Sequence, residues 1–203
     1  MESDRIMKLL IAADMHGSEY YVDKLIKAYR KEEADRMLLL GDLLYHGPRN
    51  ELPKGYRPKG VIPLLNALKH EIICVRGNCD SEVDQMVLEF PIMADYSLIQ
   101  FGSRTIFATH GHLYHPDDPP MLKSGDILVC GHTHVPKCEA HGEFVYINPG
   151  SVSIPKEGSE HGYIIADSDS GIFFWKTLEG RVYRVTDDPH LFGWNSNLYS
   201  SPR

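Results

Sequence analysis

The stretch KLLIAADMHG, residues 8–17, sets the pattern for the first half of the chain. Its apolar part is short and ends at a turn, which is typical of a strand buried on both faces of a sheet. Asp14 and His16 follow that strand directly. Two later apolar runs repeat this design: residues 36–40 end at Gly41-Asp42, and residues 71–75 run into Gly77-Asn78. The sequence therefore predicts three buried strands, each followed by polar side chains.

Helical spacing of apolar residues separates these strands. It predicts helices at 18–31, at 61–69 with Pro63 in the first turn, and at 81–90. A β-α-β-α-β order implies parallel strands with right-handed crossovers. The second half is mostly β, with hairpins at 96–108 and 137–147, a strand at 126–130 and a meander over 162–185. An α/β fold with two sheets packed face to face and helices outside accommodates both halves.

The composition is that of an ordinary globular protein. The chain has 203 residues, a net charge of −7 and 42% hydrophobic residues. We expect a single domain over 1–203, with a core at about 7–185 and a mobile tail at 186–203. The acidic balance argues against non-specific binding to nucleic acid or an anionic membrane. Four cysteines without CxxC spacing, and no apolar run long enough to span a membrane, favour a cytoplasmic protein without membrane contact.

Side chains with metal-binding chemistry stand where five of the expected strands end. They are Asp14 with His16, Asp42, Asn78, His110, and His132 with His134. Because parallel strands end at a shared edge, we expect these groups to meet there. Carboxylate, amide carbonyl and imidazole suit Mn²⁺, Fe²⁺, Zn²⁺ or Ni²⁺. Two such cations about 3.5–4 Å apart, bridged by an Asp, activate a water and clamp the oxygens of a phosphoryl group.

This series of motifs resembles the calcineurin-like metallophosphoesterase superfamily, and three longer segments resemble its small phosphodiesterase branch. The segments are His46–Arg49, Val75–Met86 and Asn148–Lys156. The resemblance runs from about residue 7 to 185 and implies the two-sheet αββα sandwich of that superfamily. It also implies the ligands of two divalent ions: Asp14, His16 and His134 for one, Asn78, His110 and His132 for the other, and Asp42 as the bridge. We expect residues 148–156 to support the metal edge from behind.

The implied activity is that of a binuclear phosphoric diester hydrolase, in which a hydroxide bridging two metal ions attacks phosphorus. Mn²⁺ is the favoured cofactor, with Zn²⁺, Fe²⁺, Ni²⁺ or Mg²⁺ as alternatives. The expected partner is a small phosphodiester, nucleic acid is not favoured, and the resemblance favours a homo-oligomer. Two alternative functions are a catalytically weak or inactive scaffold on the same fold and a phosphomonoesterase.

Three further residues are candidates for catalysis: His46, Cys79 and Asp80. Cys79 stands where many members of the superfamily have a His that helps the leaving group, and a thiol is a poor substitute for imidazolium. His46 stands where many have an Arg that contacts phosphate. We therefore expect a weak grip on a phosphomonoester dianion and a preference for diesters. Asp80 is expected to orient nearby ligands, Arg49 to anchor a loop, and His112 to line the cleft.

Overall fold

The computed structural model describes residues 7–186. The predicted tail at 186–203 therefore lies, apart from Thr186, outside the described residues, as do residues 1–6. In the described part the helices are α1 (Glu19–Glu32), α2 (Pro58–Asn66) and α3 (Glu82–Gln85). The strands are β1 (Lys8–Ala12), β2 (Arg36–Leu39), β3 (Ile72–Cys74), β4 (Tyr96–Phe101), β5 (Arg104–Thr109), β6 (Ile127–Val129), β7 (Pro136–His141), β8 (Phe144–Pro149), β9 (Gly162–Asp167), β10 (Phe173–Thr177) and β11 (Val182–Val185).

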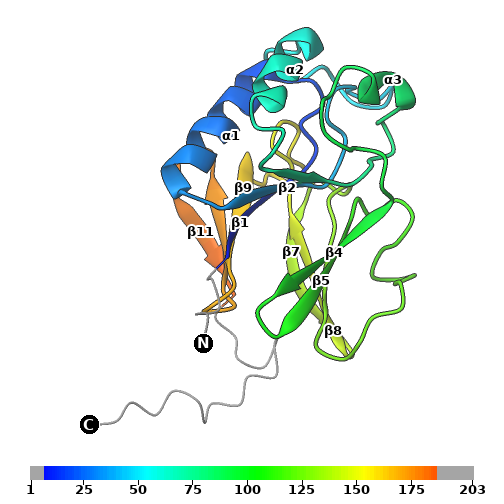
Figure 1. Cartoon of the computed structure of the whole chain (residues 1–203), viewed down its shortest axis with the longest axis vertical. Helices are drawn as coiled ribbons and strands as arrows, with labels where there is room; N and C mark the ends of the chain where they lie inside the picture. The colour runs from blue at the N-terminus through cyan, green and yellow to red at the C-terminus, as the bar shows by residue number, and fades with distance from the viewer. Residues whose placement is uncertain (1–6, 187–203) are drawn as a thin grey trace.

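Two mixed sheets make up the fold (Figure 1). The first has the order β11-β10-β9-β1-β2-β3, and its strands β1, β2 and β3 are parallel, as the β-α-β-α-β pattern predicts. The meander β9–β11 extends this same sheet through an antiparallel pairing of β9 with β1. The second sheet has the order β4-β5-β6-β8-β7, with a parallel centre and antiparallel edges. The predicted two-sheet α/β class is confirmed.

Successive side chains of β1 point to opposite faces of the first sheet, and the core accordingly has two layers. Leu9 and Ile11 face the second sheet, whereas Leu10 and Ala12 face the helices. Helix α1 begins at its N-cap Ser18, whose hydroxyl accepts the amide of Tyr21, and buries a stripe of apolar side chains against the sheet. The helices lie together on the first sheet, and the second sheet faces away from them (Figure 1).

The outer face of the second sheet has a different cover. Phe107, Leu128 and Tyr146 form a small cluster there, and Tyr114 and Leu122 pack against it from the segment between β5 and β6. Within the described residues this segment contains no helix. A loop rather than a helix therefore supplies the apolar cover on this side.

Two helix boundaries differ from the sequence-based expectation. Helix α2 begins at Pro58, which therefore occupies the first turn. Pro63 is the sixth residue of the helix and does not lie in its first turn, where the sequence predicts it. Helix α3 has only four residues instead of the ten expected. The Gln85 side chain explains its early end, because it donates to the carbonyls of Leu88 and Phe90 and accepts the amide of Ile92, which holds that segment in a turn. None of the described helices is both long and apolar enough to cross a membrane.

Candidate functional site

Loops from both sheets build the candidate site. Asp14 and His16 follow β1 of the first sheet, and Asp42 and Asn78 follow β2 and β3. The other histidines, His110, His132 and His134, come from loops after β5 and β6 of the second sheet. The sequence-based prediction assumed one shared edge. The structure shows instead that the carboxyl ends of two packed sheets meet, so that the site lies at the end of the layer between them.

The backbone is left-handed at most of the candidate ligands. Seven described residues other than glycine have positive φ, and five of them are candidate ligands. These five are Asp14 (58°), His16 (44°), Asp42 (55°), His132 (66°) and His134 (61°). Such conformations are rare for residues with a side chain, and they cluster where the surrounding structure enforces a functional geometry. The strain supports a functional role for this edge.

Glycines allow the loops after β2 and β3 to pack backbone against backbone. Gly41 has a φ of 87°, and a Cβ there would lie 2.3 Å from the amide nitrogen of Gly77. A Cβ on Gly77 would lie 2.1 Å from Oδ1 of Asp42. Both distances are far shorter than real contacts. A larger residue at position 41 would displace the backbone of Gly77, and one at position 77 would displace Asp42.

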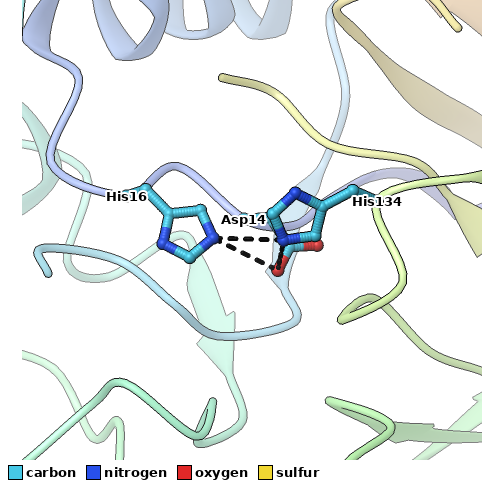
Figure 2. Close-up of side chains that lie close together, drawn as sticks. All are labelled: Asp14, His16 and His134. Atoms are coloured by element: carbon cyan, nitrogen blue, oxygen red, sulfur yellow. Dashed lines mark hydrogen bonds and ion pairs between the residues drawn. The ribbon is translucent and has the colours of Figure 1, made fainter. Parts of the chain in front are cut away.

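Asp14, His16 and His134 form a buried group of three (Figure 2). The Nε2 atoms of the two histidines are 3.2 Å apart. Oδ1 of Asp14 lies 3.8 Å from Nε2 of His16 and 3.4 Å from Nε2 of His134. Figure 2 shows both rings turned toward the carboxylate. One potential ligand atom from each residue therefore points into a single small space.

A second group adjoins the first. Nε2 of His110 lies 3.0 Å from Oδ1 of Asn78, 3.2 Å from Nδ1 of His132 and 3.5 Å from Oδ2 of Asp42. The same Oδ2 lies 3.7 Å from Nε2 of His16 in the first group. Asp42 thus stands between the two groups, and the structure brings all seven predicted ligands together.

Backbone carbonyls set the tautomers of three histidines. Nδ1 donates to the carbonyl of Tyr45 in His16, to Leu40 in His110 and to Ile154 in His134. A carbonyl only accepts, so Nδ1 carries the proton in each ring and a neutral ring presents the lone pair of Nε2 to the site. This is the orientation that outer hydrogen bonds impose on metal-binding histidines.

The donor set fits divalent cations. Oδ1 of Asp14 is buried and has no hydrogen-bond donor among the described residues. It faces two imidazole nitrogens whose lone pairs point toward it. Buried acceptors converging on one another without donors are unfavourable unless a cation lies between them. Carboxylate, carbonyl and imidazole ligands match the preferences of Mn²⁺, Fe²⁺ and Zn²⁺.

The electrostatics keep Asp14, His16 and His132 in the protonation states that bind cations, whereas His134 is held closer to its protonated form. Burial alone would raise the pKa of Asp14, but contact with His134 and the nearby His110 and His16 hold it below its usual value. Burial lowers the pKa of His16 and of His132. Burial would also lower the pKa of His134, but the adjacent Asp14 carboxylate raises it. Asp14 is therefore ionised at neutral pH, while His16 and His132 are neutral.

Asp80 connects two ligand loops. Its Oδ2 accepts the amides of Asp42 and Gly77, both at 2.8 Å, and its Oδ1 accepts the amide of Leu43 at 2.9 Å. Burial raises the pKa of Asp80 to about 6 despite these bonds. Asp80 thus contacts the backbone of the candidate ligand Asp42 and of the neighbouring Leu43 and Gly77, and its role in orienting ligands stays a prediction.

Cys79 lies at the cleft but is not poised as a nucleophile. Its amide donates to Oδ1 of Asp42 at 2.8 Å, and Nδ2 of Asn78 donates to its sulfur at 3.2 Å. Burial and the nearby Asp42 carboxylate raise the pKa of the thiol to about 12. Because only the thiolate is strongly nucleophilic, this raised pKa argues against a nucleophilic role for Cys79.

A cavity of about 440 Å³ opens over these ligands, and we call it the metal cleft. Its lining includes Cys79, Arg49, Asn50, Thr133 and Lys156 besides the ligands Asp42, Asn78, His132 and His134. His46 is not part of that lining. Its ring packs edge-on against Tyr45 and Tyr56, and Nδ1 lies 3.4 Å from the Tyr56 hydroxyl. Contact between His46 and substrate stays a prediction.

Two cationic residues at the cleft were not assigned to it from the sequence. Arg49 and Lys156 are exposed, line the metal cleft, and form no ion pair with another described residue. Arg49 had been expected to anchor its loop, and Lys156 to belong to a supporting segment. Both residues belong to segments that resemble the phosphodiesterase branch, His46–Arg49 and Asn148–Lys156. The spacing of residues in a loop does not, however, reveal the direction in which a side chain points.

Residues 148–156 support the metal edge as expected. The hydroxyls of Ser151 and Ser153 both donate to the carbonyl of Asp14 at 2.9 Å. Nδ2 of Asn148 donates to the carbonyl of Gly131 at 2.7 Å, next to His132. These buried bonds stabilise the strained backbone of the ligand loops from behind.

Comparisons with known proteins agree with this geometry. Residues 7–171 match the calcineurin-like phosphoesterase superfamily domain. The chain is 48% identical over 164 residues to phosphodiesterase YfcE of Escherichia coli K12, covering 81% of this chain and 89% of that protein. It is 29% identical to the probable metallophosphoesterase YsnB of Bacillus subtilis, over 78% of this chain and 83% of that protein.

Solved structures extend the comparison. The structure of E. coli YfcE, described as a phosphoesterase, superposes with a TM-score of 0.85 at 44% identity, covering 89% of this chain and 98% of that one. Vacuolar protein sorting 29 from Cryptosporidium parvum shares the fold at a TM-score of 0.60 and 16% identity, over 90% of this chain and 97% of that one. The family match, the relatives and the ligand geometry all agree: the chain belongs to the calcineurin-like phosphoesterase superfamily.

Proposed function

We propose that the chain is a divalent-metal-dependent phosphodiesterase. One observation carries the proposal: Oδ2 of Asp42 lies 3.7 Å from Nε2 of His16 and 3.5 Å from Nε2 of His110, so a single carboxylate faces two groups of ligands. This is the arrangement that a two-metal site requires. The 48% identity to a phosphodiesterase of E. coli supports the same activity.

The ligand groups suggest how two ions would be held. Asp14, His16 and His134 would bind one ion, Asn78, His110 and His132 the other, and Asp42 both. When bound, the pair supplies Lewis acidity and a hydroxide nucleophile for attack on phosphorus. Mn²⁺ is our first choice of ion, because oxygen and imidazole donors suit it.

The residues around the ligands supply positioning and charge. Asp80 fixes the backbones of Asp42 and Gly77, which limits movement between the two ligand groups. Arg49 and Lys156 line the metal cleft and would attract an anionic phosphate into it. Hydrogen bonds from Ser151 and Ser153 hold the Asp14 loop in place.

The chemistry of Cys79 favours diesters over monoesters. A thiol whose pKa is raised to about 12 carries no charge at neutral pH. It therefore gives a phosphomonoester dianion no cationic partner at this position. We expect faster turnover of bis(4-nitrophenyl) phosphate than of 4-nitrophenyl phosphate with Mn²⁺. Faster turnover of the monoester would instead favour a phosphomonoesterase.

The variant Asp42→Ala tests the metal-dependent activity. We expect it to lose diesterase turnover by at least about 10³-fold under saturating Mn²⁺, and calorimetry to show fewer than the two Mn²⁺ ions bound by the native chain. Asp169→Ala, at an exposed residue outside the metal cleft, is the matched control and should keep both properties. Native turnover in Asp42→Ala would refute the proposal. Two bound ions without turnover of any diester by the native chain would favour the scaffold.

A further inference from the structure

A second cavity adjoins the metal cleft, and we call it the side cavity. Its volume is about 450 Å³, close to the 440 Å³ of the metal cleft. The two cavities share His132 and Thr133 as a common wall. The side cavity lies on the outer face of the second sheet, between β7 and the loop after β5. None of the ligands other than His132 lines it.

His112 lines the side cavity, close to two of the candidate ligands. Its ring centre lies 5.3 Å from that of His110 and 6.3 Å from that of His132. The Nδ1 atom of His112 is buried and has no hydrogen-bond partner among the described residues. His112 therefore leaves one buried polar atom without a partner where the side cavity adjoins the candidate ligands.

Among the described residues, the lining of the side cavity contains several polar groups and no unpaired lysine or arginine. Two carboxylates, Asp117 and Glu139, face it, and its single lysine, Lys137, is 3.4 Å from Glu139. Further imidazoles come from His115 and His141. An anionic substituent would meet uncompensated carboxylate charge there, and an apolar one would leave these polar groups unpaired.

Hydroxyl groups match this lining. A hydroxyl donates to carboxylates and to imidazole nitrogens, and accepts from imidazole N–H groups. The buried face of Tyr146 and the ring of His141 add flat surfaces, 6.0 Å apart between ring centres, against which carbon atoms can pack. The metal cleft differs in charge, because its non-ligand lining holds the cations Arg49 and Lys156. The two cavities therefore suit different chemical groups.

A phosphodiester has two alcohol substituents, and both must be accommodated when its phosphorus lies over the metal ligands. We propose that the side cavity is a substrate subsite that takes an uncharged alcohol substituent bearing further hydroxyl groups. This inference rests on the proposed function and narrows it. The preferred substrate is then a diester whose one arm is polyhydroxylated.

Matched esters test the subsite through turnover. The two substrates are the 2,3-dihydroxypropyl and the propyl ester of 4-nitrophenyl phosphate, which differ only in two hydroxyls. We expect kcat/KM to favour the dihydroxypropyl ester by about tenfold or more, since a site built for hydroxyls rejects analogues that lack them. Asp117→Ala should reduce that ratio to less than about threefold, mainly by lowering kcat/KM for the dihydroxypropyl ester. The matched control is Asp118→Ala, because the neighbouring Asp118 is exposed and does not line the cavity.

Binding supplies a readout that does not depend on turnover. With the diamagnetic Mg²⁺-loaded protein, methyl 2,3-dihydroxypropyl phosphate should shift the ring proton resonances of His115 and His141, and methyl propyl phosphate should not. Absence of these shifts, a ratio near one in the native chain, or equal effects of Asp117→Ala and Asp118→Ala would overturn the subsite. Failure of the proposed function has a different result, because neither ester would then release 4-nitrophenol. In that case the ring proton shifts of His115 and His141 still show whether the side cavity binds the dihydroxypropyl group.

Discussion

At the scale of single residues, the main feature of this site is that its ligands occupy unfavourable backbone conformations. Five candidate ligands have positive φ between 44° and 66°. Each such residue costs on the order of 1–3 kcal/mol. The hydrogen bonds from Ser151 and Ser153 to the carbonyl of Asp14 are among the contacts that oppose this strain. The ligands are thus held in position before any cation arrives.

The identity of the ligands could be predicted from the sequence, but their conformations could not. Asp14 and Asp42 are evident because each follows a short apolar run, where strand ends deliver side chains to one edge. Their left-handed backbone could not be predicted. Asp and His adopt positive φ more often than most residues, but the majority of Asp and His residues do not, so residue type alone does not identify these positions. The direction of the Arg49 and Lys156 side chains, which line the cleft, could not be predicted either. It depends on the paths of their loops, and contacts between residues distant in the sequence determine those paths.

Cys79 offers a prediction at the residue scale. We expect Cys79→Ser to keep diesterase activity within about tenfold of native, whereas loss of an essential covalent nucleophile costs many orders of magnitude. The physical reason is the pKa of the thiol, which burial and Asp42 raise to about 12, so that the thiolate is scarce at neutral pH. Turnover of bis(4-nitrophenyl) phosphate measures the first point. Slow alkylation of Cys79 by iodoacetamide at pH 8 in the metal-free protein measures the second, and loss of all activity in the variant would contradict the prediction.

At the scale of elements, the strands were predictable and the short helices less so. The continuous apolar run of β1 predicts a buried strand, and the tertiary structure keeps that strand. Helix α3 ends after four residues because one side chain, Gln85, binds the backbone of the following turn. Helical spacing over 81–90 does not reveal such a competitor. The start of α2 was displaced for a related reason, since Pro58 is as well suited to a first helical turn as Pro63.

Asp80 provides the prediction at this scale, because it joins the loop after β2 to the loop after β3. We expect Asp80→Asn to weaken Mn²⁺ binding by about 10- to 100-fold, the usual cost of losing a residue that orients metal ligands. An amide has one acceptor oxygen, and its NH₂ group would face a backbone N–H where the carboxylate now accepts three bonds. Titration calorimetry measures the affinity. Asp84→Asn, in α3 and outside the metal cleft, is the control, and equal affinities for the native chain and Asp80→Asn would contradict this role.

Considered as a whole molecule, the site joins the two sheets. Asp14, Asp42 and Asn78 belong to loops of the first sheet, and His110, His132 and His134 to loops of the second. Each proposed ion takes ligands from both. The sandwich class could be predicted from the order of strands and helices, but the loop that covers the outer face of the second sheet could not, because its apolar residues Tyr114 and Leu122 are too few to form a periodic pattern.

Metal binding should therefore stabilise the fold as a unit. Mn²⁺ at 100 times its dissociation constant contributes about 2.7 kcal/mol per site, which raises Tm by on the order of 5–10 °C for a chain of this length. Burial lowers the pKa of His16 and of His132, whereas the Asp14 carboxylate raises the pKa of His134. Protons therefore compete with the cation first at His134, and the increase in Tm should become smaller as the pH falls from 8 toward 6. Scanning calorimetry with and without Mn²⁺ measures it. Asp42→Ala should lose most of the increase and Asp169→Ala should keep it, whereas an equal increase in both variants would show that the cation stabilises the chain somewhere other than between the sheets.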